Sequence, residues 1–244
     1  IGQGALGHGF IVFLRIGAMM AFLPAFGEQY VPMRLRLGLA LAFTLIVAPA
    51  VILPDALIGL GQALAEIVTG LFFGLLLRLF VMALQIAGSI AAQSTSLSQL
   101  FGGSAGSDPQ PAMGHVLVIA GLALAATMGL HVRIAQYMIQ GYDLVPLGHL
   151  IPPDLLSRTG LAEVSRCFAL GFTLAAPFVV ASLIYNVTLG VINKAMPQLM
   201  VAFVGAPAIT AGGLILWMIA APIILSVWAG RFGQFMAVPL AGAP

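Results

Sequence analysis

Six long apolar runs are the feature of this sequence that most constrains its fold. They lie at about 5–26, 35–53, 57–100, 112–140, 161–193 and 198–231. A helix needs about 20 apolar residues to cross the hydrocarbon core of a bilayer, and backbone groups in lipid must be hydrogen-bonded internally. Because no run alternates apolar and polar residues with a period of two, as barrel strands do, the runs predict helices. We therefore expect an all-α, multi-pass membrane-type protein in a single domain.

Composition supports a surface that is covered mostly by lipid or protein. Hydrophobic residues make up 61% of the chain and charged residues 7%, whereas a soluble domain carries about 25% charged residues. No cluster of Lys and Arg could follow a phosphate backbone, so we expect no nucleic-acid partner. Residues 1–9 lack a basic region and a cleavage site, so we expect no cleaved signal peptide.

The third apolar run is too long for one simple span. As a straight helix, residues 57–100 would extend about 65 Å, so we expect a bend or break at Gly70, Gly74 or Gly88. Small residues four positions apart also let helices approach closely. They occur at Gly70-x3-Gly74, Gly121-x3-Ala125-x3-Gly129 and Ala83-x3-Ala87-x3-Ala91.

Three charged residues lie inside apolar runs: Arg15, Glu66 and Arg78. A charge at the centre of a bilayer costs about 2.5–3.5 kcal/mol, so these side chains should face protein, water or each other. They could belong to a conducting path or proton relay, or they could form helix-packing ion pairs or headgroup anchors; we favour the second alternative. Glu66 and Arg78 are about 18 Å apart along one helix, so their partners must come from another segment or subunit.

Motifs for catalysis are absent from the sequence. Lys194 has no G-x4-G before it, and no G-x-S-x-G, H-E-x-x-H or C-x-x-C pattern occurs. Cys167 is the single cysteine, and the four histidines are dispersed. We therefore expect no enzymatic activity, no catalytic or metal site and no cofactor.

Two of the polar breaks between the apolar runs are candidate functional segments. Residues 93–114 follow the third run and carry Leu100 and Phe101 ahead of a glycine-rich stretch. This apolar tip could fill an opening, or the segment could be an ordinary surface loop. Residues 193–207 form the second break, where Pro197 should end a helix. The expected hairpin tip carries Asn193, Lys194 and Gln198, and it offers a partner surface.

An ordered set of short motifs covers nearly the whole chain. It comprises Arg15, Pro24, Glu28, "VPMRLRLGLAL" (31–41), Ala87-Gly88, Asp108-Pro109, His131, "LVPLG" (144–148), Ala176-Pro177, "LGVIN" (189–193), Pro197-Gln198-Leu199, Gly205 and Pro207. In this order the chain resembles the FliR/SctT family of the type III secretion export apparatus. Lys194 departs from the pattern, because arginine is commoner there in the family.

The resemblance implies a core subunit of a protein export gate. The family passes unfolded flagellar or virulence proteins across the bacterial inner membrane, so the expected location is that membrane, in the flagellar basal body. Residues 1–160 would be the FliP-like part, and residues 161–244 the FliQ-like helical hairpin. The implied partners are FliP and FliQ homologues in a hetero-oligomeric gate, FlhB and FlhA homologues, unfolded export substrates and membrane lipid.

The resemblance also assigns roles to two segments. A channel plug would be formed by Leu97, Ser98, Gln99, Leu100, Phe101, Gly102 and Gly103. The hairpin tip, with Asn193, Lys194, Pro197 and Gln198, would contact FlhB.

A self-contained secondary transporter is the alternative function. Arg15, Glu66 and Arg78 would then line a charge path through the membrane. Such transporters are often built from internal repeats, and residues 1–120 and 121–244 share no convincing repeat. A transporter should purify alone, whereas a gate subunit should need its companion subunits.

Overall fold

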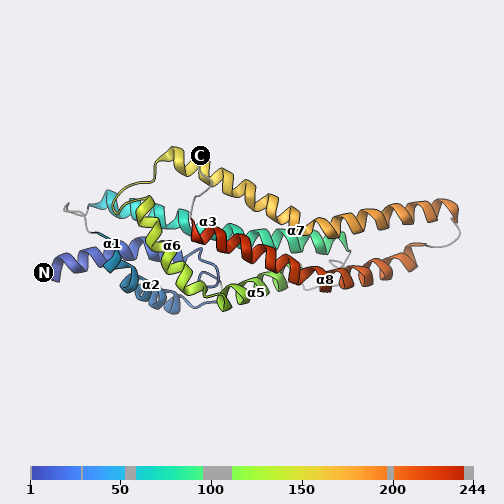
Figure 1. Cartoon of the computed structure of the whole chain (residues 1–244), viewed down its shortest axis with the longest axis horizontal. Helices are drawn as coiled ribbons and strands as arrows, with labels where there is room; N and C mark the ends of the chain where they lie inside the picture. The colour runs from blue at the N-terminus through green and yellow to red at the C-terminus, as the bar shows by residue number, and fades with distance from the viewer. Residues whose placement is uncertain (1, 29, 53–58, 96–111, 197–200, 239–244) are drawn as a thin grey trace. The chain divides into compact units, whose positions relative to one another are not determined.

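A computed structural model describes residues 2–28, 30–52, 59–95, 112–196 and 201–238. Its elements follow the apolar runs along the chain (Figure 1). They are α1 (Gly2–Met20), α2 (Met33–Val47), the 3-10 turn η1 (Ala48–Ala50), α3 (Leu60–Ser94), α5 (Ala112–Thr127), α6 (Leu130–Leu144), α7 (Pro153–Ala195) and α8 (Val201–Ala237).

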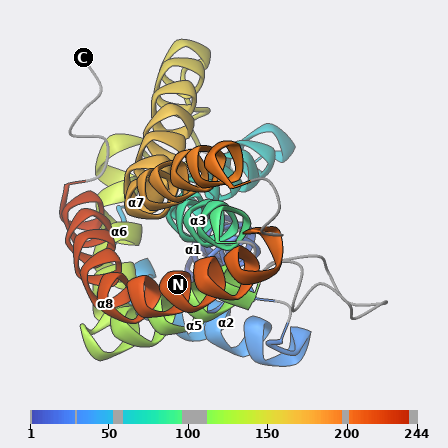
Figure 2. The ribbon, with the colours of Figure 1, turned by 90° about the vertical axis from the view of Figure 1, so that its right-hand side faces the viewer.

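Helix α3 is one unbroken helix of 35 residues, about 52 Å long (Figure 1, Figure 2). The expected break at Gly70, Gly74 or Gly88 is therefore wrong, and a bend there stays a prediction. These glycines instead admit the backbones of neighbouring helices, because a Cβ atom at each of them would collide with α1 or α5. The close approach predicted from the Gly70-x3-Gly74 spacing is confirmed.

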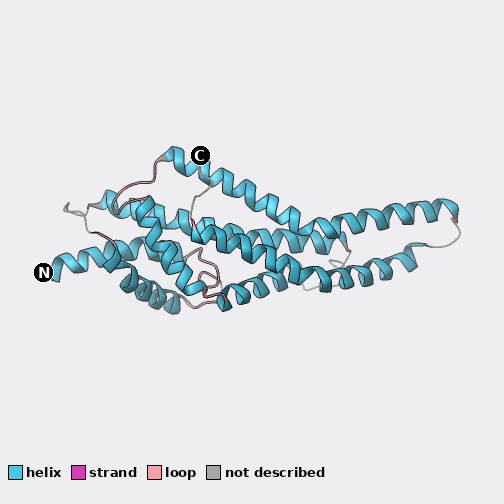
Figure 3. Cartoon of the chain, in the orientation of Figure 1, coloured by secondary structure: helices cyan, strands magenta, loops and turns pink. Residues whose placement is uncertain are grey.

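The fourth apolar run, 112–140, forms two helices that meet at an angle of 80°. Gly129 lies between them with a φ of 78°, in the left-handed region that glycine tolerates best. The expected count of six helices is therefore not confirmed. Helices are the only regular structure in the described part of the chain (Figure 3), so the all-α class is confirmed.

Within the described residues, four helical segments are long and apolar enough to cross a membrane. They are Met33–Ala50, Leu60–Ser94, Pro153–Ala195 and Pro207–Ala237, and the bent α5–α6 pair would make a fifth. The expected multi-pass membrane character is confirmed.

The chain divides into two compact units. Unit 1 comprises Ile1–Phe80, Ala125–Ser165 and Arg231–Pro244, and unit 2 comprises Val81–Leu124 and Arg166–Gly230. Long helices α3, α7 and α8 thus contribute residues to both units. The expected division into 1–160 and 161–244 stays a prediction.

Unit 1 has an aromatic core that joins three helices. The Phe73 and Tyr137 rings are 5.8 Å apart, Tyr137 and Phe235 are 6.0 Å apart, and Phe80 lies 5.0 Å from Phe235. The Tyr137 hydroxyl donates to the backbone carbonyl of Phe73. These contacts fasten the C-terminal end of α8 to α3 and α6.

Unit 2 is organised around the second half of α3. A Cβ atom at Gly114 of α5 would touch the Gln85 backbone, one at Gly171 of α7 would meet Ile86, and one at Gly213 of α8 would meet Thr95. Small residues therefore bring α5 and α7 close to the second half of α3, and α8 close to Thr95 just after its end. Ala83, Ala87 and Ala91 are all buried on it, as their spacing predicts.

Candidate functional site

The crossing of α1 and α3 in unit 1 sets the position of its buried charges. A side chain at Gly70 would collide with the Arg15 carbonyl, and one at Gly74 would come 2.7 Å from the Met19 carbonyl oxygen. Because the two backbones touch here, the Arg15 side chain reaches Glu66, one turn before Gly70 on α3.

Arg15 and Glu66 form a two-pronged ion pair. The Arg15 Nε donates to Glu66 Oε2 at 2.6 Å, and Arg15 Nη2 donates to Oε1 at 2.9 Å. Arg15 is 1% exposed and Glu66 is fully buried. Paired geometry of this kind is the strongest arrangement for arginine and carboxylate groups. Two of the charges predicted to lie inside the apolar runs are thus each other's partners.

The same pair holds the backbone that follows α6. Arg15 Nη1 donates to the carbonyl of Val145 at 2.8 Å and, more weakly, to that of Gly141 at 3.4 Å. Glu66 Oε1 accepts the Gly148 amide at 2.7 Å. The guanidinium carbon lies 3.9 Å from the centroid of the Tyr142 ring, a cation–π contact. The charges are therefore satisfied by each other and by the backbone.

Arg78 finds a different partner in the loop after α1. Its Nη1 is hydrogen-bonded to the Glu28 carboxylate, and both side chains are partly buried. Arg36 binds the same loop from α2, donating to the carbonyls of Glu28 and, at 3.1 Å, Val31. All three charges named from the apolar runs therefore have partners within unit 1.

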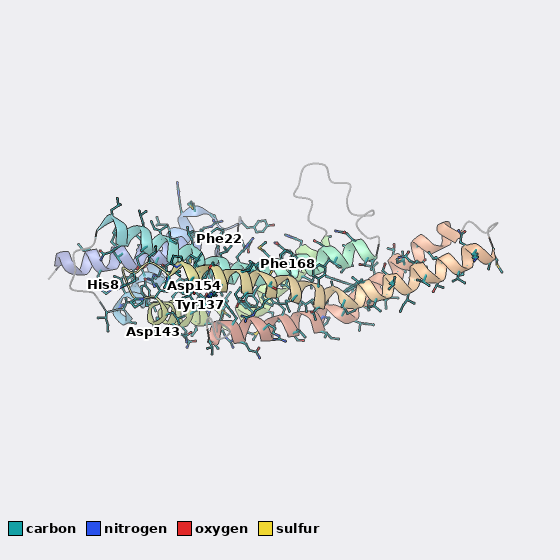
Figure 4. All side chains as sticks on the ribbon, turned by 90° about the horizontal axis from the view of Figure 1, so that it is seen from above. His8, Phe22, Tyr137, Asp143, Asp154 and Phe168 are labelled. Carbon is teal, nitrogen blue, oxygen red and sulfur yellow. The ribbon has the colours of Figure 1, made fainter. Side chains whose placement is uncertain are left out.

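In unit 2, α7 and α8 form two long antiparallel arms, 166–195 and 201–230 (Figure 1, Figure 4). The Phe178 and Trp217 rings meet at 6.0 Å, and nearer the tip the Tyr185 hydroxyl donates to the Gly205 carbonyl. Most other described side chains of the arms are exposed. The large apolar ones include Phe168, Phe172, Val180, Leu183, Ile184, Val187 and Val191 on α7, and Leu214, Ile215, Met218, Ile219 and Ile223 on α8.

The predicted hairpin tip is described in part. Asn193 and Lys194 lie exposed in the last turn of α7, which ends at Ala195, two residues before Pro197. Pro197 and Gln198 lie outside the described residues. The predicted plug residues, Leu97 to Gly103, also lie outside them.

Sequence reasoning did not identify several residues of the buried centre. Gly141, Val145 and Gly148 act through their backbone, and Tyr142 through its ring. The "LVPLG" motif was the available signal for this turn, although nothing in it names Arg15 or Glu66 as its partner. Glu163, which is 5% exposed, is a further buried carboxylate that was missed. Across the described part of the chain, no group of three or more His, Cys, Asp or Glu side chains could hold a metal ion.

Comparisons with known proteins identify relatives along nearly the full chain. The sequence model of the family described as "Bacterial export proteins, family 1" matches residues 6–235. The flagellar biosynthetic protein FliR of Caulobacter vibrioides is 33% identical over 237 residues, which cover 93% of this chain and 94% of that protein. FliR of Aquifex aeolicus is 27% identical over 93% of this chain and 90% of its own length. FliR of Escherichia coli is also 27% identical, over 86% and 83%.

Proposed function

This chain belongs to the bacterial export proteins, family 1, and from this premise we propose that it is a non-enzymatic core subunit of a protein export gate. At a coarser level it is an integral membrane component of the flagellar export apparatus. In the proposal, the gate lies in the bacterial inner membrane and passes unfolded flagellar or virulence proteins. Its other subunits are FliP and FliQ homologues, and FlhB and FlhA homologues act beside it.

The observation that carries this proposal is the length of uncharged, exposed helix in the arms. No Asp, Glu, Lys or Arg occurs in the 30 residues from 201 to 230 of α8, which extend about 45 Å. The hydrocarbon core of a bilayer is only about 30 Å thick. Met218, Ile219 and Ile223 are each at least 60% exposed. An upright span would leave part of this apolar length outside the hydrocarbon core, so neighbouring protein subunits are the better cover.

Co-production tests the assembly role. The chain should accumulate and purify as a homogeneous species only when it is produced with its FliP and FliQ companions. Production alone should give aggregated or degraded protein. A chain that purifies alone in a single folded state and carries out transport in vesicles would contradict the proposal.

The plug assignment is a separate part of the proposal. A short apolar tip at Leu100 and Phe101 would exclude water and ions from the lumen, and each of its contacts is weak enough for a threaded chain to displace. Deleting 102–107 should leave assembly intact and make the membrane leak small ions. Leu100→Ser with Phe101→Ser, which keeps the loop length, should also leak. Unchanged ion permeability in assembled complexes of both variants would remove the assignment.

The hairpin tip is proposed as the contact for an FlhB homologue. Lys194→Glu with Gln198→Ala should impair export more strongly than assembly, because it reverses the charge of an exposed tip residue. Arg34→Glu is the matched control, since Arg34 is an exposed cation on α2. Normal swimming of the tip variant would show that the tip is only a turn.

A further inference from the structure

We propose that Arg15 and Glu66 act as one unit that caps the turn between α6 and α7 and thereby positions the start of α7 within unit 1. In this view the two residues are positioning residues, and their mutual attraction is only part of their contribution. The inference goes beyond the proposed gate function, which assigns the pair no role.

The guanidinium group of Arg15 lies at the C-terminal end of α6. The last carbonyls of a helix have no partner within it. Gly141 O accepts the Val145 amide at 3.0 Å, but the Val145 carbonyl lies beyond the end of α6. Arg15 supplies a donor to this carbonyl at 2.8 Å, and Val145 is only 3% exposed. A buried carbonyl without a donor costs about 1–3 kcal/mol, so the guanidinium group is needed here as a donor.

The carboxylate of Glu66 binds the amide of Gly148, three residues after Val145. Gly148 adopts a φ of 81°, in the left-handed region, and donates its N–H to Glu66 Oε1 at 2.7 Å. The Gln62 side chain already occupies the adjoining space, with its Nε2 3.4 Å from where a Gly148 Cβ would lie. The carboxylate is therefore the acceptor for this turn amide.

These two contacts determine which position must hold the cation and which the anion. The turn presents a carbonyl to Arg15 and an amide to Glu66. If the two side chains were exchanged, a carboxylate would face the carbonyl of Val145 and a guanidinium would face the amide of Gly148. An ion pair that acted only through its own charges would tolerate the exchange, whereas this one should not.

The turn leads directly into the first part of α7. Leu147 and Ile151 are 5% and 2% exposed, so the segment is inserted into the core of unit 1. Helix α7 begins two residues after Ile151, and its residues 153–165 belong to the same unit. A fixed turn therefore fixes where α7 begins.

Hydrogen exchange at residues 145–152 tests the proposal in the full chain, assembled with its companion subunits. Arg15→Glu with Glu66→Arg should raise exchange in this segment at least tenfold and abolish motility. Glu66→Leu should raise exchange by a similar factor. Glu66→Gln keeps an acceptor for the Gly148 amide and should stay within about threefold of the parent chain. Peptides from the second half of α3 report whether unit 2 is intact and should not change.

Asp154→Arg with Arg158→Asp is the matched exchange control. These side chains form a pair at 2.7 Å on α7 and are each 72% exposed. Swapping the two residues should therefore change neither hydrogen exchange at 145–152 nor motility. The proposal would be overturned if Arg15→Glu with Glu66→Arg kept both the parent's slow hydrogen exchange at 145–152 and its motility. Equal loss of protection in Glu66→Gln and Glu66→Leu would also overturn it. So would failure of Glu66→Gln to accumulate, because the negative charge and not the acceptor would then be required.

Discussion

The buried charge centre of unit 1 and the hairpin arms of unit 2 differ in how far their side chains are withdrawn from solvent. Arg15 and Glu66 are almost completely withdrawn from solvent, and their hydrogen bonds are made within the chain. Along the arms, large apolar side chains such as Phe172 and Met218 remain 60% and 71% exposed. The Arg15–Glu66 pair therefore makes its polar contacts within the chain, whereas the exposed side chains of the arms require surroundings that the chain does not supply.

The difference has an energetic basis. A buried ion pair is costly to desolvate, and it is tolerated only when additional hydrogen bonds satisfy both partners. Apolar surface left in water costs about 25 cal/mol per Å², so an exposed apolar arm gains stability when lipid or protein covers it. Buried side chains should therefore respond to mutation through folding, and the exposed side chains of the arms through assembly.

Two phenylalanines on α7 provide the largest expected effect. Phe178 is fully buried against Trp217, whereas Phe172 is exposed. Phe178→Ala should destabilise the folded chain by about 3–5 kcal/mol, because it leaves a cavity. Phe172→Ala should change the stability of the unassembled chain little. It should weaken association by about 1.5–3 kcal/mol, the value of burying one such side chain.

Thermal unfolding in detergent and the yield of co-purified complex separate these two effects. Leu161→Ala serves as an exposed control near the start of α7, within unit 1. If Phe172→Ala lowered the unfolding temperature as much as Phe178→Ala does, the arms would not differ from an ordinary core.

The next largest effect is expected at Gly70, where the backbones of α1 and α3 touch beside the buried pair. Gly70→Ala should cost about 2–3 kcal/mol, because the added methyl group meets the rigid Arg15 carbonyl and α1 must move. Gly61→Ala, on the same helix with open space around it, should be neutral or stabilise by up to about 1 kcal/mol. Folded yield and unfolding temperature provide the measurement, and equal effects at the two glycines would show that α1 and α3 do not touch.

Gly70 also illustrates what can be predicted from a sequence of this kind. Its spacing from Gly74 correctly predicted a close helix contact, but the same glycines wrongly suggested a break in α3. A glycine lacks a side chain in either case, so only the neighbouring backbone decides which role it takes. At Gly129 the opposite occurred: it was placed in a packing stripe, yet its positive φ marks the break between α5 and α6.

The charged residues show a similar limit. Their positions in apolar runs predicted that they need partners, because lipid cannot solvate them. Periodicity along one helix could not identify Glu28 as the partner of Arg78, 50 residues away. Nor could it predict that backbone groups of the turn after α6 would complete the Arg15 site, since a carbonyl or amide carries no sequence signature.

The smallest expected effect concerns the contact that ties the arms together near the tip. The half-buried Tyr185 donates its hydroxyl to the Gly205 carbonyl, and α7 continues for ten residues beyond it to Ala195. Tyr185→Phe removes one hydrogen bond of about 1 kcal/mol. Local opening of the end of α7 should therefore become about fivefold more frequent, seen as faster hydrogen exchange in residues 186–196. Tyr137→Phe is the matched control in unit 1, because it loses a comparable bond to the Phe73 carbonyl. It should leave exchange at 186–196 unchanged. Faster exchange at the tip in both variants would mean that the two regions are coupled, and the contrast between a self-sufficient core and dependent arms would then fail.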